Sequence, residues 1–115
     1  MTQAIFRHGD PLACNYTPGA DVAAGDVIVL NSRTYVARHA IASGALGALD
    51  CEGGVYTCVG DAAITAGKKV YWKDSANKVS EDADTGNNKP FGYVAPGSSC
   101  SGDGSTVDVV HDPSA

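Results

Sequence analysis

The most regular alternation of hydrophobic and polar residues in the chain runs over residues 69–73. Val70 and Trp72 fall on one side of an extended backbone, and the two lysines and the tyrosine around them fall on the other. A period of two residues is typical of a β-strand with one buried face. Four residues that favour turns, 74–77, come next, and residues 78–80 can return alongside the first strand. The pattern therefore predicts a β-hairpin that carries the single tryptophan.

A weaker copy of this segment lies earlier in the chain, at residues 22–30. When the Ala-Gly pairs of the two segments are aligned, Ile28 matches Val70. The tripeptide Tyr-Val-Ala follows each copy, at residues 35–37 and 93–95. These echoes predict two related β units that share one core.

Other short apolar runs, bounded by glycine, proline or polar residues, predict further strands. They lie at residues 12–16, 26–31, 34–39, 49–59, 91–95 and 106–111. Residues 40–49 are rich in alanine, but Gly44 and Gly47 each weaken a helix by about 1 kcal/mol relative to alanine, so we expect a loop with at most one or two helical turns. The fourteen glycines and five prolines indicate many turns and favour an all-β protein.

The length of 115 residues suits a single domain, and the 43% of hydrophobic residues is enough for an ordinary core. We predict one compact β-sandwich or barrel-like domain at residues 12–111, with an extended N-terminal arm at residues 1–11 and a tail at residues 112–115. The arm contains Ile5 and Phe6, which are hydrophobic without an obvious reason unless they pack on something. The arm therefore either contacts another molecule or pairs with an edge strand of its own domain.

The charge of the chain limits its partners. A formal net charge of −5 argues against nucleic-acid binding, which needs a basic face. We interpret the lysines at 68, 69 and 73 as a solvated strand face, with an anionic partner as the alternative. No apolar run approaches the roughly 20 residues of a membrane helix, and residues 1–11 lack the apolar segment of a signal peptide. We expect synthesis in a cytoplasm and no membrane partner.

The four cysteines, Cys14, Cys51, Cys58 and Cys100, allow disulfides by their even number, but no export signal supports an oxidising compartment. In one continuous strand, Cys51 and Cys58 would lie about 23 Å apart. If residues 53–54 formed a hairpin, Cys51 would face a tyrosine instead; otherwise these two glycines indicate a bulge or a close approach. We expect buried thiols, and the alternative is at least one disulfide that involves Cys14 or Cys100.

No arrangement of residues indicates catalysis, a cofactor or a metal site. The three histidines fall near strand boundaries, where surface histidines are common; they are His8, His39 and His111. Several aspartates occupy turns or strand edges, which aspartate favours for backbone reasons; they are Asp10, Asp26, Asp50 and Asp61. A small hydrolase, whose catalytic residues only folding would bring together, is the least favoured function.

The order and spacing of several segments resemble the decoration, or cement, proteins that coat the heads of tailed phages. The matching segments are residues 24–30, 35–37, 53–56, 66–74, 77–79, 91–95 and 107–109. The most specific is 67–74 followed by 77–79. The resemblance extends from about residue 9 to residue 110, and the chain departs from the family in its four cysteines and its long 96–105 loop.

This resemblance implies a β-sandwich or barrel-like domain, commonly a homotrimer, that binds the major capsid protein on the outer surface of the head and bridges neighbouring subunits. It implies no catalytic residue. From the residues themselves we predict capsid binding by Ile5, Phe6 and Arg7, and an oligomer interface at Tyr71 and Trp72; core or rim packing is the alternative for this last pair. An alternative function is a displayed binding module for a glycan or a host surface, with loops 81–89 and 96–105 as its binding elements.

Overall fold

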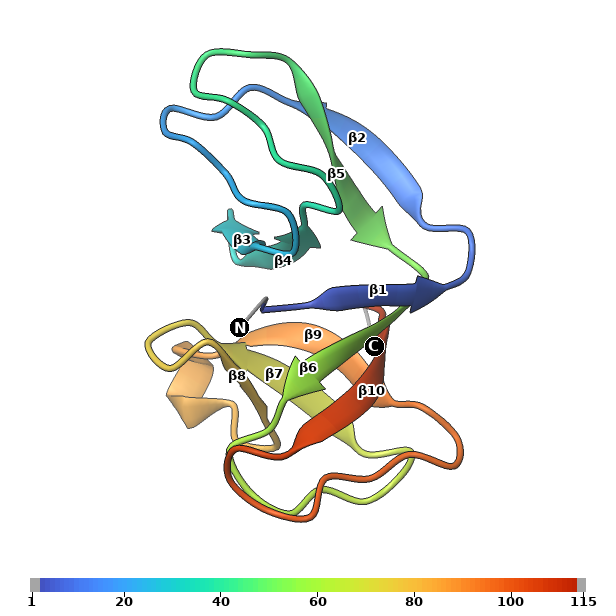
Figure 1. Ribbon diagram of the computed structural model, residues 1–115. Helices are drawn as coiled ribbons and strands as arrows, with labels where there is room; N and C mark the ends of the chain where they lie inside the picture. Colours follow the sequence, from blue (N-terminus) through green and yellow to red (C-terminus); the bar gives the residue numbers. More distant parts are fainter. Residues whose placement is uncertain (1–2, 114–115) are drawn as a thin grey trace.

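The computed structural model describes residues 3–113, and within them the chain forms ten β-strands in two sheets (Figure 1). The first sheet has the order β1-β6-β10-β9-β7-β8, formed by β1 (Ile5–His8), β6 (Val55–Val59), β10 (Thr106–His111), β9 (Lys89–Val94), β7 (Lys69–Lys73) and β8 (Lys78–Ser80). The second has the order β2-β5-β4-β3, formed by β2 (Leu12–Tyr16), β5 (Gly47–Glu52), β4 (Arg33–Val36) and β3 (Val27–Leu30). A single 3-10 turn, η1 (Asp84–Gly86), precedes β9. The all-β prediction is confirmed.

The six-stranded sheet curls into a barrel. A parallel bridge between Gly60, which follows β6, and Val79 on β8 brings the two ends of the curled sheet together, with β1 left as an edge strand outside the closure. Trp72, Tyr56 and Phe91 are fully buried inside it. The predicted hairpin is therefore present as β7 and β8, and Trp72 lies at the centre of the barrel.

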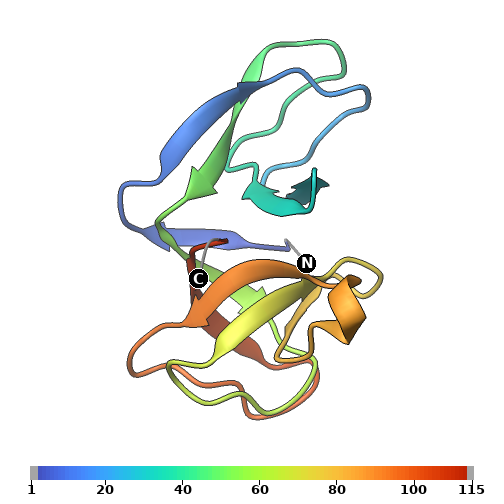
Figure 2. The same ribbon diagram turned by 180° about the vertical axis from the view of Figure 1, so that it is seen from behind.

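The four-stranded sheet lies across one open end of the barrel, and both views show β3 and β4 next to it (Figures 1 and 2). Val27 and Val36 belong to the same core cluster as Trp72. On the other face, Leu49 and Ile41 are the larger members of a second, smaller cluster. The radius of gyration of 13.1 Å is that of a single compact body of this length.

The two predicted β units are visible as similar local structures. Gly25 and Gly67 follow equivalent turns with φ of 88° and 81°, a conformation that glycine adopts without strain. The Gly25 N–H donates to the Ala37 carbonyl at 2.5 Å, and the Gly67 N–H donates to the Val94 carbonyl at 3.0 Å. Ala37 is therefore equivalent to Val94, so the Tyr-Val-Ala echo is displaced by one residue from the structural equivalence.

The N-terminal segment is not the extended arm that we predicted. It forms the edge strand β1, with Ile5 opposite Thr57 on β6, so the alternative of pairing within its own domain applies. Ala4 is 2% exposed, and its N–H donates to the Gly25 carbonyl at 2.9 Å. Burial of apolar side chains is the physical reason that the segment docks. Residues 1–2 of the predicted arm and residues 114–115 of the predicted tail lie outside the described residues.

The chain leaves the barrel after β1, builds the four-stranded sheet with residues 12–52, and re-enters the barrel at β6. The points at which the chain leaves and re-enters the barrel, at Gly9 and Gly54, are two adjacent crossings between the sheets. A Cβ atom added to Gly9 would lie only 2.8 Å from the Cα of Gly54. The close approach predicted for residues 53–54 is confirmed, but the continuous strand at 49–59 is wrong: β5 and β6 belong to different sheets.

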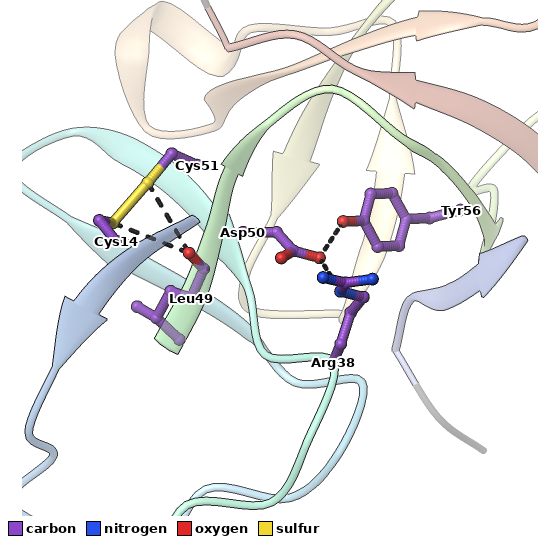
Figure 3. A network of polar contacts seen from close by, with 6 residues as sticks. All are labelled: Cys14, Arg38, Leu49, Asp50, Cys51 and Tyr56. Atoms are coloured by element: carbon purple, nitrogen blue, oxygen red, sulfur yellow. Dashed lines mark hydrogen bonds and ion pairs between the residues drawn. A yellow bond between two sulfur atoms is a disulfide. The ribbon is translucent and has the colours of Figure 1, made fainter. Parts of the chain in front are cut away.

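The cysteines divide into two pairs. Cys14 and Cys51 form a disulfide across β2 and β5, with a Cα–Cα distance of 6.5 Å (Figure 3). A register shift between these strands leaves Cys51 as the extra residue on β5, within reach of Cys14. Cys58 and Cys100 are buried free thiols. Burial raises the pKa of the Cys58 thiol, so it stays protonated and unreactive at neutral pH. The expectation of buried thiols is wrong for the first pair, and the alternative of a disulfide involving Cys14 applies.

Candidate functional site

A pocket of about 360 Å³ opens between β1 and the four-stranded sheet, and we call it the β1 pocket. Its lining is apolar except for one guanidinium; the lining residues are Ala4, Ile5, Phe6, Ala24, Gly25 and Arg38. Two of the three residues that we predicted to bind the capsid, Ile5 and Phe6, therefore lie on one wall of it. The pocket runs beside β1, the edge strand of its sheet, and next to it the Ala4 N–H is paired with the Gly25 carbonyl.

Phe6 is held from two sides. Its ring packs edge-on against Tyr56, with centroids 5.6 Å apart. On the pocket side, the guanidinium carbon of Arg38 lies 4.7 Å from the centre of the Phe6 ring, which is cation–π distance. These contacts fix the aromatic wall of the pocket and place a positive charge at its mouth.

Arg38 is anchored by a buried carboxylate (Figure 3). Its Nε lies 2.8 Å from Asp50 Oδ2, and the Tyr56 hydroxyl donates to the same oxygen. The Asp50 side chain is 4% exposed, whereas that of Arg38 is 33% exposed. A buried carboxylate requires such partners, because it would otherwise bear the full cost of losing its water. Burial, reinforced by the hydrogen bond to Asp50, raises the pKa of Tyr56, so its hydroxyl remains a donor.

Sequence reasoning missed this group of three residues. We had interpreted Asp50 as a strand-edge aspartate that needs no special role, and nothing had singled out Arg38. The three residues come from β5, β6 and the segment after β4, and only the pairing of these elements brings them together. The one available signal was a carboxylate between Leu49 and Cys51 within an apolar strand.

Arg7, the third predicted capsid-binding residue, lies on the other face of β1. Its Nε donates to the Thr57 hydroxyl at 2.6 Å, and that hydroxyl donates to Asp108 Oδ1 at 2.6 Å. This chain of hydrogen bonds crosses from β1 over β6 to β10. Arg7 is exposed and held in place on the outer surface of the barrel.

The two residues that we predicted at an oligomer interface point in opposite directions. Trp72 is 0% exposed, packs beside Phe91, and donates its ring N–H to Asp74 Oδ1 at 3.1 Å. Tyr71 is half-buried on the outer face of β7, with the Lys69 ammonium 5.3 Å from the centre of its ring. Of this pair, only Tyr71 has surface available to another molecule.

A metal site and a membrane-spanning helix are both absent from the described residues. Within residues 3–113, no group of three or more His, Cys, Asp or Glu side chains is placed to hold a metal ion. In the same part of the chain, no helix is long and apolar enough to cross a membrane. The β1 pocket lies beside the edge strand of a sheet, and sheet edges are one kind of place where proteins bind other chains.

The comparison with known families identifies the class more closely. The family model described as phage cement protein matches residues 6–111, and the chain belongs to this family. No curated protein and no solved structure matches it significantly. Membership confirms the resemblance found in the sequence and gives the chain a structural role in the phage capsid.

Proposed function

We propose that this protein binds the outer surface of the phage head, contacts the major capsid protein through β1 and the β1 pocket, and stabilises the shell by bridging neighbouring capsid subunits. The observation that carries the proposal is the placement of Ile5 and Phe6 in an open, mainly apolar pocket beside an edge strand, in a chain of the cement family. The proposal contains no catalytic step.

The stabilisation follows from linkage. A protein that binds only the assembled shell lowers the free energy of that state and leaves the dissociated subunits unchanged. A homotrimer would contact several subunits at once, so that modest single contacts add up through multivalency. We propose that Tyr71, on the outer face of the barrel, contributes to the contact between copies.

The direct test mixes the purified protein with expanded empty capsids and measures co-sedimentation. Deleting residues 2–7 is a poor variant, because Ala4 and Phe6 pack in the barrel core. Ile5→Asp places a charge on β1 beside the pocket, opposite Thr57, and should abolish co-sedimentation. Leu46→Asp, at a side chain 71% exposed on a loop before β5, is the matched control and should bind like the wild type.

Failure of the wild-type protein to bind capsids would overturn the proposal. If Ile5→Asp and the wild type are both folded by circular dichroism and bind capsids equally, the part of the proposal that assigns capsid contact to β1 is wrong. A glycan array with the same preparation tests the alternative of a displayed module for a glycan or a host surface, for which binding to defined glycans without capsid binding is the expected result.

A further inference from the structure

The four-stranded sheet repeats the arrangement of four strands of the barrel. Its order β2-β5-β4-β3 corresponds strand by strand to β6-β10-β9-β7 in the six-stranded sheet. The connecting loops make the same contact in both sheets. The Gly44 N–H donates to the Pro18 carbonyl at 2.9 Å, and in the barrel the Gly104 N–H donates to the Gly60 carbonyl at 3.0 Å. The two sheets can therefore be compared position by position, with β2 in the place of β6.

Strand β2 has much less support from its surroundings than β6. Strand β6 lies between β1 and β10, and its Tyr56 and Cys58 are 0% exposed in the barrel core. Strand β2 is an edge strand paired with β5, and four of its five residues are exposed. Tyr16, at its end, packs partly buried against the smaller apolar cluster. Little buried apolar surface therefore holds β2 on its sheet.

The Cys14–Cys51 disulfide occupies the position where the barrel has an aromatic pair (Figure 3). When the register of β2 on β5 is superimposed on that of β6 on β10, Cys14 corresponds to Tyr56. On the neighbouring strands, Cys51 corresponds to His111. The rings of Tyr56 and His111 are buried and pack edge-on, with centroids 5.9 Å apart. A covalent bond thus links the exposed strand at the place where buried rings hold its barrel counterpart.

We infer that the Cys14–Cys51 disulfide is a redox latch for β2. While the bond is closed, β2 stays paired with β5; when the bond is reduced, β2 separates from β5 and the barrel stays folded. Separation makes β5 the new edge strand of the sheet, with backbone groups free to pair with another chain. The inference goes beyond the proposed function and does not depend on capsid binding.

The bond is accessible to small thiols and disulfides, because Cys14 is exposed and Cys51 is half-buried. One thiolate of a dithiol attacks a sulfur of the bond, and its second thiolate displaces the mixed disulfide. The protein S–S bond breaks, both cysteine sulfurs take up protons, and the reductant is oxidised to a cyclic disulfide. A low-molecular-weight disulfide reverses the change: it accepts the two electrons and leaves as two thiols. The buried thiols of Cys58 and Cys100 take no part.

Hydrogen–deuterium exchange of the wild-type protein, with and without dithiothreitol, tests the latch. Mass spectrometry of peptides that cover residues 12–16 and residues 55–59 compares β2 with its barrel counterpart β6. We expect reduction to bring the protected amides of 12–16 to within about tenfold of the exchange rate of an unstructured chain, while those of 55–59 stay at least about a hundredfold slower than that rate. The fluorescence maximum of Trp72, buried in the barrel, should not shift.

The variant Cys14→Ser/Cys51→Ser is the second arm of the experiment. Without reductant it should show the exchange pattern of the reduced wild type, and dithiothreitol should not change it. This arm also separates the latch from any effect of the reductant on Cys58 and Cys100, which the variant retains. Iodoacetamide should add two carbamidomethyl groups to the folded, reduced wild type, at Cys14 and Cys51, and this mass change confirms that the bond is open.

Two results would overturn the inference. In the first, residues 12–16 keep their protection in the alkylated wild type and in the double variant, so that β2 stays paired without the bond. In the second, residues 12–16 and 55–59 lose protection together and the Trp72 fluorescence shifts, so that opening the bond unfolds the whole domain instead of releasing one strand. Loss of protection confined to the four-stranded sheet supports the inference.

Discussion

His111 and Thr34, which are 77 residues apart in the chain, meet inside the molecule and join the barrel to the sheet that covers its end. The imidazole Nε2 lies 3.1 Å from the Thr34 carbonyl oxygen and 3.2 Å from its hydroxyl. A carbonyl oxygen only accepts, so Nε2 carries a proton. Burial lowers the pKa of the ring, so it is neutral at pH 7. The Thr34 hydroxyl donates to the Pro90 carbonyl at 2.9 Å, which ties β9 to the same point.

The buried His111 makes the folded state sensitive to acid. Burial lowers its pKa from 6.5 to about 4. The unfolded chain takes up a proton near pH 6.5, whereas the folded chain does so only near pH 4, so acid favours the unfolded state. The contribution is fully present above pH 6.5 and is lost as the pH falls toward 4, at about 1.4 kcal/mol per unit and about 3 kcal/mol in all.

Urea unfolding between pH 7.5 and 4.5 checks this dependence. The free energy of unfolding of His111→Gln should fall less steeply over this range than that of wild type, because the variant lacks this titration. NMR gives a second measurement that needs no variant: the His111 ring signals of the folded protein should not titrate above pH about 5. A midpoint near the ordinary histidine value would contradict the prediction.

Tyr56→Phe removes one of the two partners of the buried Asp50 carboxylate. We expect the free energy of unfolding to fall by about 1.5–3 kcal/mol, the range for a hydrogen bond to a charged group. Tyr93→Phe, at a half-buried tyrosine on β9, is the control and should change it by less than about 0.5 kcal/mol. Equal effects of the two substitutions would show that the contact with Asp50 adds nothing.

Reduction of the Cys14–Cys51 disulfide should destabilise the fold. The bond closes a loop with a sequence separation of 37, for which the chain-entropy model gives about 4 kcal/mol, and about 2–4 kcal/mol is the expected loss. Guanidinium unfolding with and without dithiothreitol measures it. The variant Cys14→Ser/Cys51→Ser should be insensitive to the reductant, and a wild-type midpoint that does not move would contradict the prediction.

Substitutions at Tyr71 and at Trp72 should have different effects, the first on oligomerisation and the second on folding stability. Tyr71→Ala should weaken association between copies in sedimentation velocity, because its side chain is on the surface, while the circular dichroism spectrum is kept. Trp72→Phe should lower the free energy of unfolding by about 1–3 kcal/mol, because it leaves a cavity in the barrel. Unchanged association in Tyr71→Ala would remove this residue from the proposed interface.

The sequence predicted the features that depend on neighbouring residues. The β7–β8 hairpin, the buried face of Val70 and Trp72 and the two related β units all follow from local alternation and turn residues, and all are present. The features it missed depend on pairing between distant strands. The disulfide requires the register of β2 on β5, and the anchored Arg38 requires β5, β6 and the segment after β4 to meet. No spacing within the chain encodes such meetings.

The neighbouring crossings at Gly9 and Gly54 give the chain a modular layout. The segment between them forms the four-stranded sheet, and its two ends lie side by side at the rim of the barrel. Elongation or replacement of the part of this segment farthest from the barrel leaves the path of the barrel strands unchanged, provided that Thr34 and Val36 still cover the rim. The tip that carries Leu46 is therefore a natural point for grafting a foreign peptide for display.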